Sequence, residues 1–304
     1  MIILNRDREI VSVESWGDIV GRPGFTGSLN PSAHELESII GRYAFRAYIP
    51  CGLSNCHTPH GKGYIVVTKD GRETNIGKDC GKKYFGVDFE TLSSQFDRAV
   101  TEKENREKVW NFFFRIDEVQ EQVKNLRGGD RGAEWVYKTS TPLTSGGKDV
   151  PSAVVRRIGA MVKTGETILT VEREANEDEI KAQERQTQRS VKRPFYVSVP
   201  VAEVAGLDAL YAENNLKELL VLKVAEPLKD LERLDIDSLD FNDLKRWARW
   251  IGEVEGNLDR AAAAIEKGRR LLTRANLEPF GTAAGLDVDS WAQFNRFLEQ
   301  LPKA

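Results

Sequence analysis

All three cysteines of this 304-residue chain, and two of its three histidines, lie between residues 51 and 80. These five residues are Cys51, Cys56, His57, His60 and Cys80. Thiolate and imidazole groups are the ligands that tetrahedral zinc prefers, and a structural zinc site takes four of them. The clustering therefore predicts a metal site that organises the local fold.

Five candidate side chains compete for four ligand places. We predict that Cys51, Cys56, His60 and Cys80 bind a structural Zn²⁺, with His57 as the alternative to His60. His57 directly follows a predicted ligand, so its ring is poorly placed to turn back onto the same ion, whereas flanking glycines leave the backbone free at His60. Two other interpretations stay open. The cysteines are ordinary buried residues, or two of them form a disulfide, which is unusual in a reducing compartment.

The residues between the predicted ligands indicate a β-hairpin. Residues 64–68 are β-branched and aromatic, which is typical of a strand. The Asp70-Gly71 pair favours a tight turn, and residues 73–76 form the expected returning strand. Cys80 then lies near the start of a predicted helix, where backbone amides favour a thiolate.

Residues 71–86, GRETNIGKDCGKKYFG, resemble the second half of a small treble-clef-like zinc module of uncharacterised bacteriophage and plasmid proteins. The closing motif of that module is matched here by Ile76, Gly77, Cys80, Phe85 and Gly86. In the first half the usual cysteines stand two residues apart, whereas four residues separate Cys51 from Cys56. The resemblance implies a phage or mobile-element origin, and hence the cytoplasm of a bacterial host.

Composition narrows the class of protein further. Hydrophobic residues make up 40% of the chain and charged residues 30%, as in ordinary soluble proteins. No run approaches the roughly 18 apolar residues of a membrane span, and the N-terminus lacks the layout of a signal peptide, so we expect a cytoplasmic protein with no membrane partner. Neither a G-x-S-x-G nor an H-E-x-x-H pattern occurs. We therefore expect no enzymatic activity, with a zinc hydrolase as the less favoured alternative.

Charge is distributed unevenly. The whole chain has a formal net charge of −3, but residues 41–86 contain eight basic and three acidic residues, a balance of +5. A basic module in an acidic protein favours weak, salt-sensitive contact with nucleic acid, through Arg72, Lys78, Lys82 and Lys83. The alternative is a protein-binding inhibitor or adaptor of a host complex, such as an anti-phage defence complex.

The pattern along the rest of the chain predicts an α+β protein. The expected order is a small zinc-binding β-hairpin module near the N-terminus, a long helix, and a predominantly helical C-terminal domain. A helix is expected over residues 31–47 and a loop over residues 139–151. Residues 109–114 are apolar except for Asn111 and exceed one helix stripe. They are interpreted as core packing or a helical hairpin, with docking to a partner and self-association into a homo-oligomer as the alternative. The predicted boundaries are 1–48 for an α/β lead-in, 49–88 for the zinc module, 89–138 for the long helical segment, 139–200 for a mixed region with a polar connector, and 201–304 for the helical domain.

Overall fold

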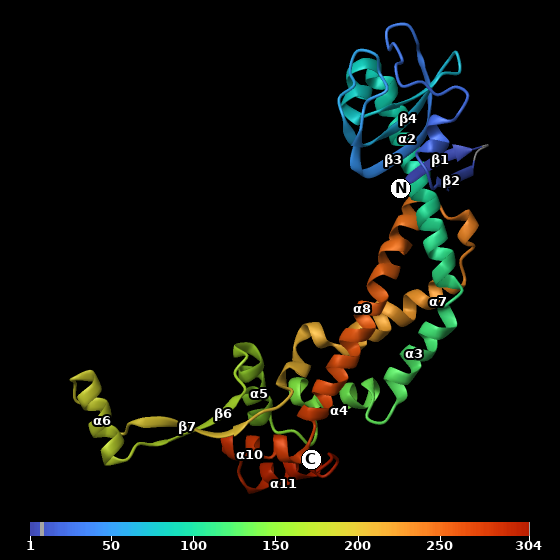
Figure 1. Cartoon of the computed structure of the whole chain (residues 1–304). Helices are drawn as coiled ribbons and strands as arrows, with labels where there is room; N and C mark the ends of the chain where they lie inside the picture. Colours follow the sequence, from blue (N-terminus) through green and yellow to red (C-terminus); the bar gives the residue numbers. More distant parts are fainter. Residues whose placement is uncertain (7–8, 304) are drawn as a thin grey trace. The chain divides into compact units, whose positions relative to one another are not determined.

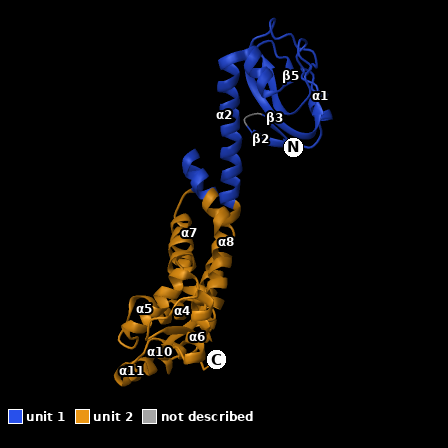
Figure 2. Cartoon of the chain, turned by 90° about the vertical axis from the view of Figure 1, so that its left-hand side faces the viewer, with its two compact units in different colours: residues 1–110, 236–248 blue, residues 111–235, 249–304 orange. Residues whose placement is uncertain are grey.

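The computed structural model describes residues 1–6 and 9–303, which form two compact units. Unit 1 contains residues 1–110 and 236–248, and unit 2 contains residues 111–235 and 249–304 (Figure 2). The architecture is α+β, as the sequence predicts: an N-terminal antiparallel sheet with the cysteines, a long helix α2 (Lys78–Phe113), and a mostly helical C-terminal part (Figure 1).

Unit 1 is built on a five-stranded antiparallel sheet with strand order β2-β1-β3-β4-β5. Its strands are β1 (Ile2–Arg6), β2 (Glu9–Val13), β3 (Leu36–Ile49), β4 (His60–Thr68) and β5 (Glu73–Ile76). A short helix α1 (Gly17–Val20) follows β2. The predicted hairpin of the zinc module is therefore the outer part of a larger sheet, and the expected boundary at residue 48 lies inside β3.

The helix predicted over residues 31–47 was wrong, because that segment contains β3. Its sequence LESIIGRYAFRAYI is rich in β-branched and aromatic residues, which fit a pleated surface. Strand β3 pairs with β1 on one side and with β4 on the other. These pairings satisfy the backbone groups that a helix would have bonded internally.

Successive residues of the strands point to opposite faces, and each face has its own core. On one face Ile3 and Val66 pack with Phe89 and Phe96 of α2. On the other face the neighbouring residues in the sequence, Leu4 and Ile65, pack in a second cluster that includes Ile19 of α1. Both faces of the sheet are thus covered, and the face against α2 also includes Cys51.

Helix α2 changes direction at Gly86, whose φ of 56° and ψ of −133° lie outside the helical region. Only glycine adopts such a conformation without steric cost. Earlier in the helix, a Cβ at Gly81 would lie 2.3 Å from the ring of Phe89. The small residue next to Cys80 therefore lets this buried aromatic ring pack directly against the first turn of α2.

Unit 2 consists of helices and one β-ribbon. The elements with residues only in this unit are α3 (Ile116–Gly128), α4 (Ala133–Ser145), α5 (Ser152–Thr164), β6 (Ile168–Glu174), α6 (Glu177–Thr187), β7 (Tyr196–Glu203), η1 (Leu207–Leu210), η2 (Ala212–Asn214), η3 (Lys217–Ala225), α7 (Glu226–Glu232), α9 (Arg274–Leu277), α10 (Pro279–Ala283) and α11 (Val288–Leu298). Helix α8 (Phe241–Leu271) contributes to both units, and η4 (Ile236–Ser238) belongs to unit 1.

The loop predicted over residues 139–151 was wrong in its first half, because α4 continues to Ser145. Pro142 lies within the last turn of this helix, where it has no backbone N–H to donate to the carbonyl of Lys138 four residues earlier. Leu143 is fully buried. Burial of apolar side chains on α4 therefore outweighs the turn-forming tendency of the Ser, Thr and Pro residues around them.

Element η3 is a nine-residue π-helix that leads directly into α7. Pro227, near the start of α7, has no backbone N–H, so it gives no α-helical hydrogen bond to the carbonyl of Lys223 four residues earlier. The indole Nε1 of Trp250 donates to that carbonyl instead, at 2.7 Å. A side chain from α8 thus satisfies a backbone group that proline leaves open.

Strands β6 and β7 form a two-stranded antiparallel ribbon, and α6 connects them (Figure 1). Asn176 caps α6 through a reciprocal capping box with Glu179. Ile168, Tyr196 and Val201 of the ribbon are 56%, 56% and 45% exposed. The predicted polar connector is therefore a capped helix carried on an exposed ribbon.

Candidate metal centre

Two backbone elements, a loop and the start of a helix, bring the cysteines of unit 1 together. Cys51 and Cys56 lie in the loop between β3 and β4, and Cys80 lies in the first turn of α2. Backbone hydrogen bonds hold the loop: the amide of Gly52 donates to the carbonyl of Asn75, and the amide of Leu29 donates to the carbonyl of Gly52. The loop is thus fixed to β5 on one side and to the segment before β3 on the other.

The sulfur atoms are close enough to share one ion. All three lie within 4.8 Å of one another, and the Sγ atoms of Cys56 and Cys80 are 3.2 Å apart. Zinc–sulfur bonds of about 2.3 Å at tetrahedral angles place two sulfurs about 3.8 Å apart. The value of about 3.8 Å lies within the 4.8 Å bound on the three separations, and all three cysteines are free thiols. These three cysteines can therefore hold a metal ion such as zinc.

The electrostatics of the cluster differ from one thiol to the next. Burial raises the pKa of the Cys51 thiol. The hydroxyl and the backbone amide of Thr58 lower the pKa of Cys56 to about 7 by hydrogen bonding to its thiolate. Burial, followed by the contact with Cys56, raises the pKa of Cys80 to about 12. Without a cation, ionisation of a second or a third thiol is unfavourable, because it brings negative charges close together. A divalent ion offsets these charges and favours the ionised thiols.

The structure places His60 in a hydrogen-bond network beside the cysteines. Its Nδ1 lies 3.0 Å from the carbonyl of Thr58, and its Nε2 lies 2.6 Å from the hydroxyl of Tyr43. A carbonyl only accepts, so Nδ1 carries the proton and Nε2 accepts from Tyr43. The amide of Asn75 in turn donates to the Tyr43 hydroxyl and to the carbonyl of Pro50. Both ring nitrogens of His60 thus have partners that tie the loop to the sheet.

His57 differs from His60 in backbone and in contacts. Its φ of 54° places it in the left-handed region, which is uncommon for a residue other than glycine. Its Nδ1 lies 3.3 Å from the carbonyl oxygen of Cys51. Within the described residues, neither histidine belongs to the group of metal-competent atoms that the three cysteines form.

The four basic residues predicted to contact nucleic acid lie in different surroundings. Arg72 forms an ion pair with Asp70 at 3.1 Å, and Lys82 forms one with Glu90 at 2.8 Å. The ammonium group of Lys83 lies 5.1 Å from the centre of the Tyr84 ring. Lys78 instead lines a hollow of unit 1. Three of the four therefore have intramolecular partners of their own.

Sequence reasoning missed that hollow, which has a volume of about 370 Å³ and is also lined by Arg42 and Lys62. A usable signal was present in the hairpin. Tyr64 pairs with Ile76 in the antiparallel β4–β5 ladder. Lys62 lies two residues before Tyr64 and Lys78 lies two residues after Ile76, so both lysines lie at the same end of the hairpin. The expected hairpin therefore already placed these lysines near each other.

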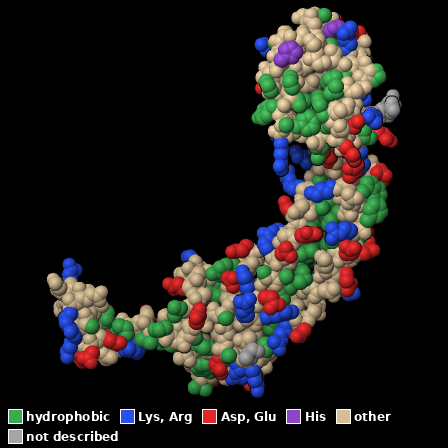
Figure 3. Space-filling model, in the orientation of Figure 1, with side chains coloured by type: hydrophobic (Ala, Val, Ile, Leu, Met, Phe, Trp, Pro, Cys, Tyr) green, Lys and Arg blue, Asp and Glu red, His purple; other side chains and the backbone are tan. Residues whose placement is uncertain are grey.

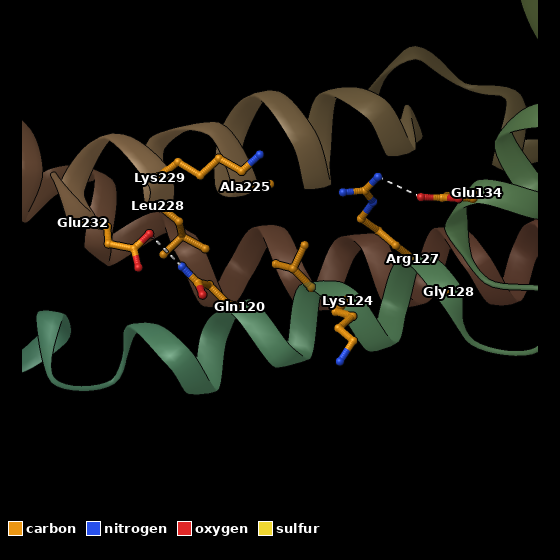
Figure 4. A pocket seen from close by; sticks show the side chains of 10 residues that line it. Gln120, Lys124, Arg127, Gly128, Glu134, Ala225, Leu228, Lys229 and Glu232 are labelled. Carbon is orange, nitrogen blue, oxygen red and sulfur yellow. Dashed lines mark hydrogen bonds and ion pairs between the residues drawn. The ribbon is translucent and has the colours of Figure 1, made fainter.

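Unit 2 has a hollow of about 470 Å³ between α3 and the η3–α7 segment (Figure 4). Arg127 forms an ion pair with Glu134 at 2.8 Å, and the side-chain amide of Gln120 donates to Glu232 at 3.4 Å. On the face that Figure 3 draws, basic and acidic side chains are intermingled over this unit. The hollow therefore combines apolar residues such as Val123 and Leu228 with charged residues of both signs.

Comparison of the chain with protein-family models, with curated proteins and with solved structures gave no match. Across residues 1–6 and 9–303, no helix is both long enough and apolar enough to span a membrane.

Proposed function

We propose that this protein is a non-enzymatic, zinc-containing binding protein whose unit 1 contacts nucleic acid. The convergence of Cys51, Cys56 and Cys80 from a loop and a helix start carries the zinc part of the proposal. The order of metal-binding turn, hairpin and helix suits a treble-clef-like module, and the phage or plasmid resemblance is consistent with action in a bacterial cytoplasm. Three thiolates favour a closed structural site over an open catalytic one.

The fourth ligand in this proposal is His57. His60 would have to give up its hydrogen bonds to Tyr43 and Thr58 before it could bind an ion. His57 gives up only its longer contact with the Cys51 carbonyl. His60 then acts as a neighbour that holds the loop against β3 through Tyr43.

The metal content of the purified protein, measured by mass spectrometry of the elements, tests the zinc proposal. We expect one zinc ion per chain, and a protein that takes up no zinc after refolding with it would contradict the proposal. Substitution with Co²⁺ tests the ligands. We expect His57→Ala to change the visible absorption bands of bound Co²⁺, and the matched control His60→Ala to leave them unchanged. The reverse result would assign the fourth place to His60.

Nucleic-acid contact is supported by the +5 balance of residues 41–86 in a chain of net charge −3. Such contact is mainly electrostatic, so we expect affinity in the micromolar range or weaker and a steep loss with salt. Fluorescence anisotropy of a labelled 20-nucleotide single strand, titrated with zinc-loaded protein at low salt, measures this directly. Absence of binding at low salt to single strands and to duplexes would remove the nucleic-acid proposal.

A second candidate function is a protein-binding inhibitor or adaptor of a host complex, and the β6–β7 ribbon favours it. Both strands of a two-stranded ribbon are edge strands, with backbone groups open to pairing by another chain. Ile168, Tyr196 and Val201 add exposed apolar surface to those edges. Replacement of residues 168–203 by a short glycine-serine linker should abolish a stoichiometric, nuclease-resistant complex in a host lysate. A complex that persists without the ribbon would contradict this candidate.

A further inference from the structure

The hollow lined by Lys62 and Lys78 in unit 1 has an unusual balance of charge. Its charged side chains are Arg42, Lys62, Lys78 and one carboxylate, Asp97. Asp97 already accepts hydrogen bonds from the Tyr64 hydroxyl at 2.7 Å and from Arg42 at 3.3 Å. The Asp97 carboxylate is therefore already bonded to Tyr64 and Arg42, which line the same hollow.

The two lysines lack such a partner. Among the residues that the structure describes, no carboxylate forms an ion pair with Lys62 or with Lys78. Arg42, by contrast, binds Asp97 and also Glu104 at 3.1 Å. Like charges that share a surface repel each other, so two unpaired lysines in one hollow cost stability unless an anion lies between them.

The hollow is also of a suitable size and chemistry. A volume of about 370 Å³ accommodates one nucleotide unit, and Tyr43 and Tyr64 supply aromatic surface on its wall. The tyrosine hydroxyls are held by His60 and by Asp97 respectively. The wall is therefore firm, while the lysine ammonium groups remain able to move towards a ligand.

We propose that this hollow is a phosphate-binding site, in which Lys62 and Lys78 contact a phosphate group of a nucleic-acid strand. The proposal rests on the proposed contact of unit 1 with nucleic acid, and it changes the residues responsible. Lys78 keeps its predicted role, Lys62 is added, and Arg72 and Lys82 are bound to their own carboxylates. A free nucleotide offers the same phosphate chemistry as a strand, so the test separates these two sources.

The test compares single substitutions in the zinc-loaded full chain by anisotropy with the labelled 20-nucleotide strand. We expect Lys62→Ala and Lys78→Ala each to weaken binding about tenfold and to reduce the salt slope by about 0.7, the value for one lost phosphate contact on a single strand. The controls Lys69→Ala and Lys82→Ala remove the same charge from lysines that are paired with Glu35 and Glu90. We expect both controls to retain the parent slope.

Equal losses in all four variants would overturn the phosphate site and leave general electrostatic binding in place. A second titration uses inorganic phosphate and thymidine monophosphate, followed through the backbone amide signals of residues 62–64. If those signals shift and Lys62→Ala abolishes the shift while the strand does not bind, the site takes a free phosphate compound and the nucleic-acid proposal fails. If neither probe binds, both proposals fail. Zinc content and circular dichroism, unchanged in each variant, exclude unfolding as the cause.

Discussion

The loop that carries Cys51 and Cys56 and the helices of unit 2 are held in place by different forces. Residues 50–59 contain three consecutive buried residues but otherwise little apolar surface, and backbone hydrogen bonds hold them beside the cysteine cluster. Unit 2 contains neither cysteine nor histidine and relies on buried side chains such as Leu231 and Phe280. A short loop without a core of its own needs a cross-link, and a helical unit of this size does not.

The largest expected effect comes from removing the metal or a ligand. With a strong chelator, or in Cys80→Ser, we expect amide hydrogen exchange to rise by orders of magnitude over residues 50–59 and over β4–β5. Metal binding contributes roughly 10 kcal/mol to the folding of small zinc modules. We expect a smaller contribution here, because unit 1 is also stabilised by its own hydrophobic core. Exchange in α11 should stay unchanged. Equal loss of exchange protection in the cysteine loop and in α11 would contradict this difference between the two regions.

A buried aromatic residue in unit 2 gives the opposite pattern. Phe280→Ala should destabilise unit 2 by about 3–5 kcal/mol, because it removes a fully buried ring and leaves a cavity. Zinc content should remain that of the parent protein. The matched variant Phe89→Ala removes an equally buried ring beside Cys80 in unit 1, and we expect it to weaken zinc retention as well. Chemical denaturation together with metal analysis measures both effects.

The zinc affinity of unit 1 should depend on pH, whereas the exchange protection of unit 2 should not. The pKa of Cys51 is raised and that of Cys80 is raised to about 12, so both are protonated in the metal-free protein at pH 7, where Cys56, with a pKa of about 7, is half ionised. Zinc binding then expels at least two protons. The apparent affinity should rise roughly 100-fold or more per unit as pH increases from 6 to 8, and should fall by the same factor on acidification.

Competition with a zinc-binding dye at several pH values provides that slope. Unit 2 has no group of this kind, so its protection from exchange, corrected for the intrinsic rate, should be flat over the same range. A slope of less than two protons would mean that Cys51 and Cys80 do not both bind the ion.

The smallest expected effect is local to the ribbon of unit 2. Asn176→Ala removes both the side-chain acceptor for the first amides of α6 and the capping box with Glu179. Loss of such a cap costs about 1 kcal/mol. We expect faster exchange in α6 alone, with the cysteine loop and α11 unchanged. The conservative control Asn176→Asp keeps the acceptor and should restore parent protection.

The sequence predicted local features well wherever a few neighbouring residues decide the structure. The β4–β5 hairpin follows from the Asp70-Gly71 turn between two β-forming runs, and β5 covers the predicted residues 73–76. The helix start near Cys80 is similarly local. The sequence pattern predicted the wrong secondary structure where residues far apart in the chain determine it. The pattern of residues 31–47 predicts a helix, whereas β3 pairs with β1 and β4, which its own sequence does not reveal.

By itself, the sequence determined that three thiols lie in one short segment, that a hairpin separates the second from the third, and that the surrounding residues are basic. Only the tertiary structure decided how these parts combine. It brought three sulfurs within 4.8 Å of one another, tied His60 to Tyr43 across the sheet, and placed Lys62 and Lys78 in one hollow whose carboxylate, Asp97, is already bonded to Tyr64 and Arg42. The physical reason is that spacing along a chain fixes turns and periodicity, whereas distances between atoms depend on how strands pair and side chains pack.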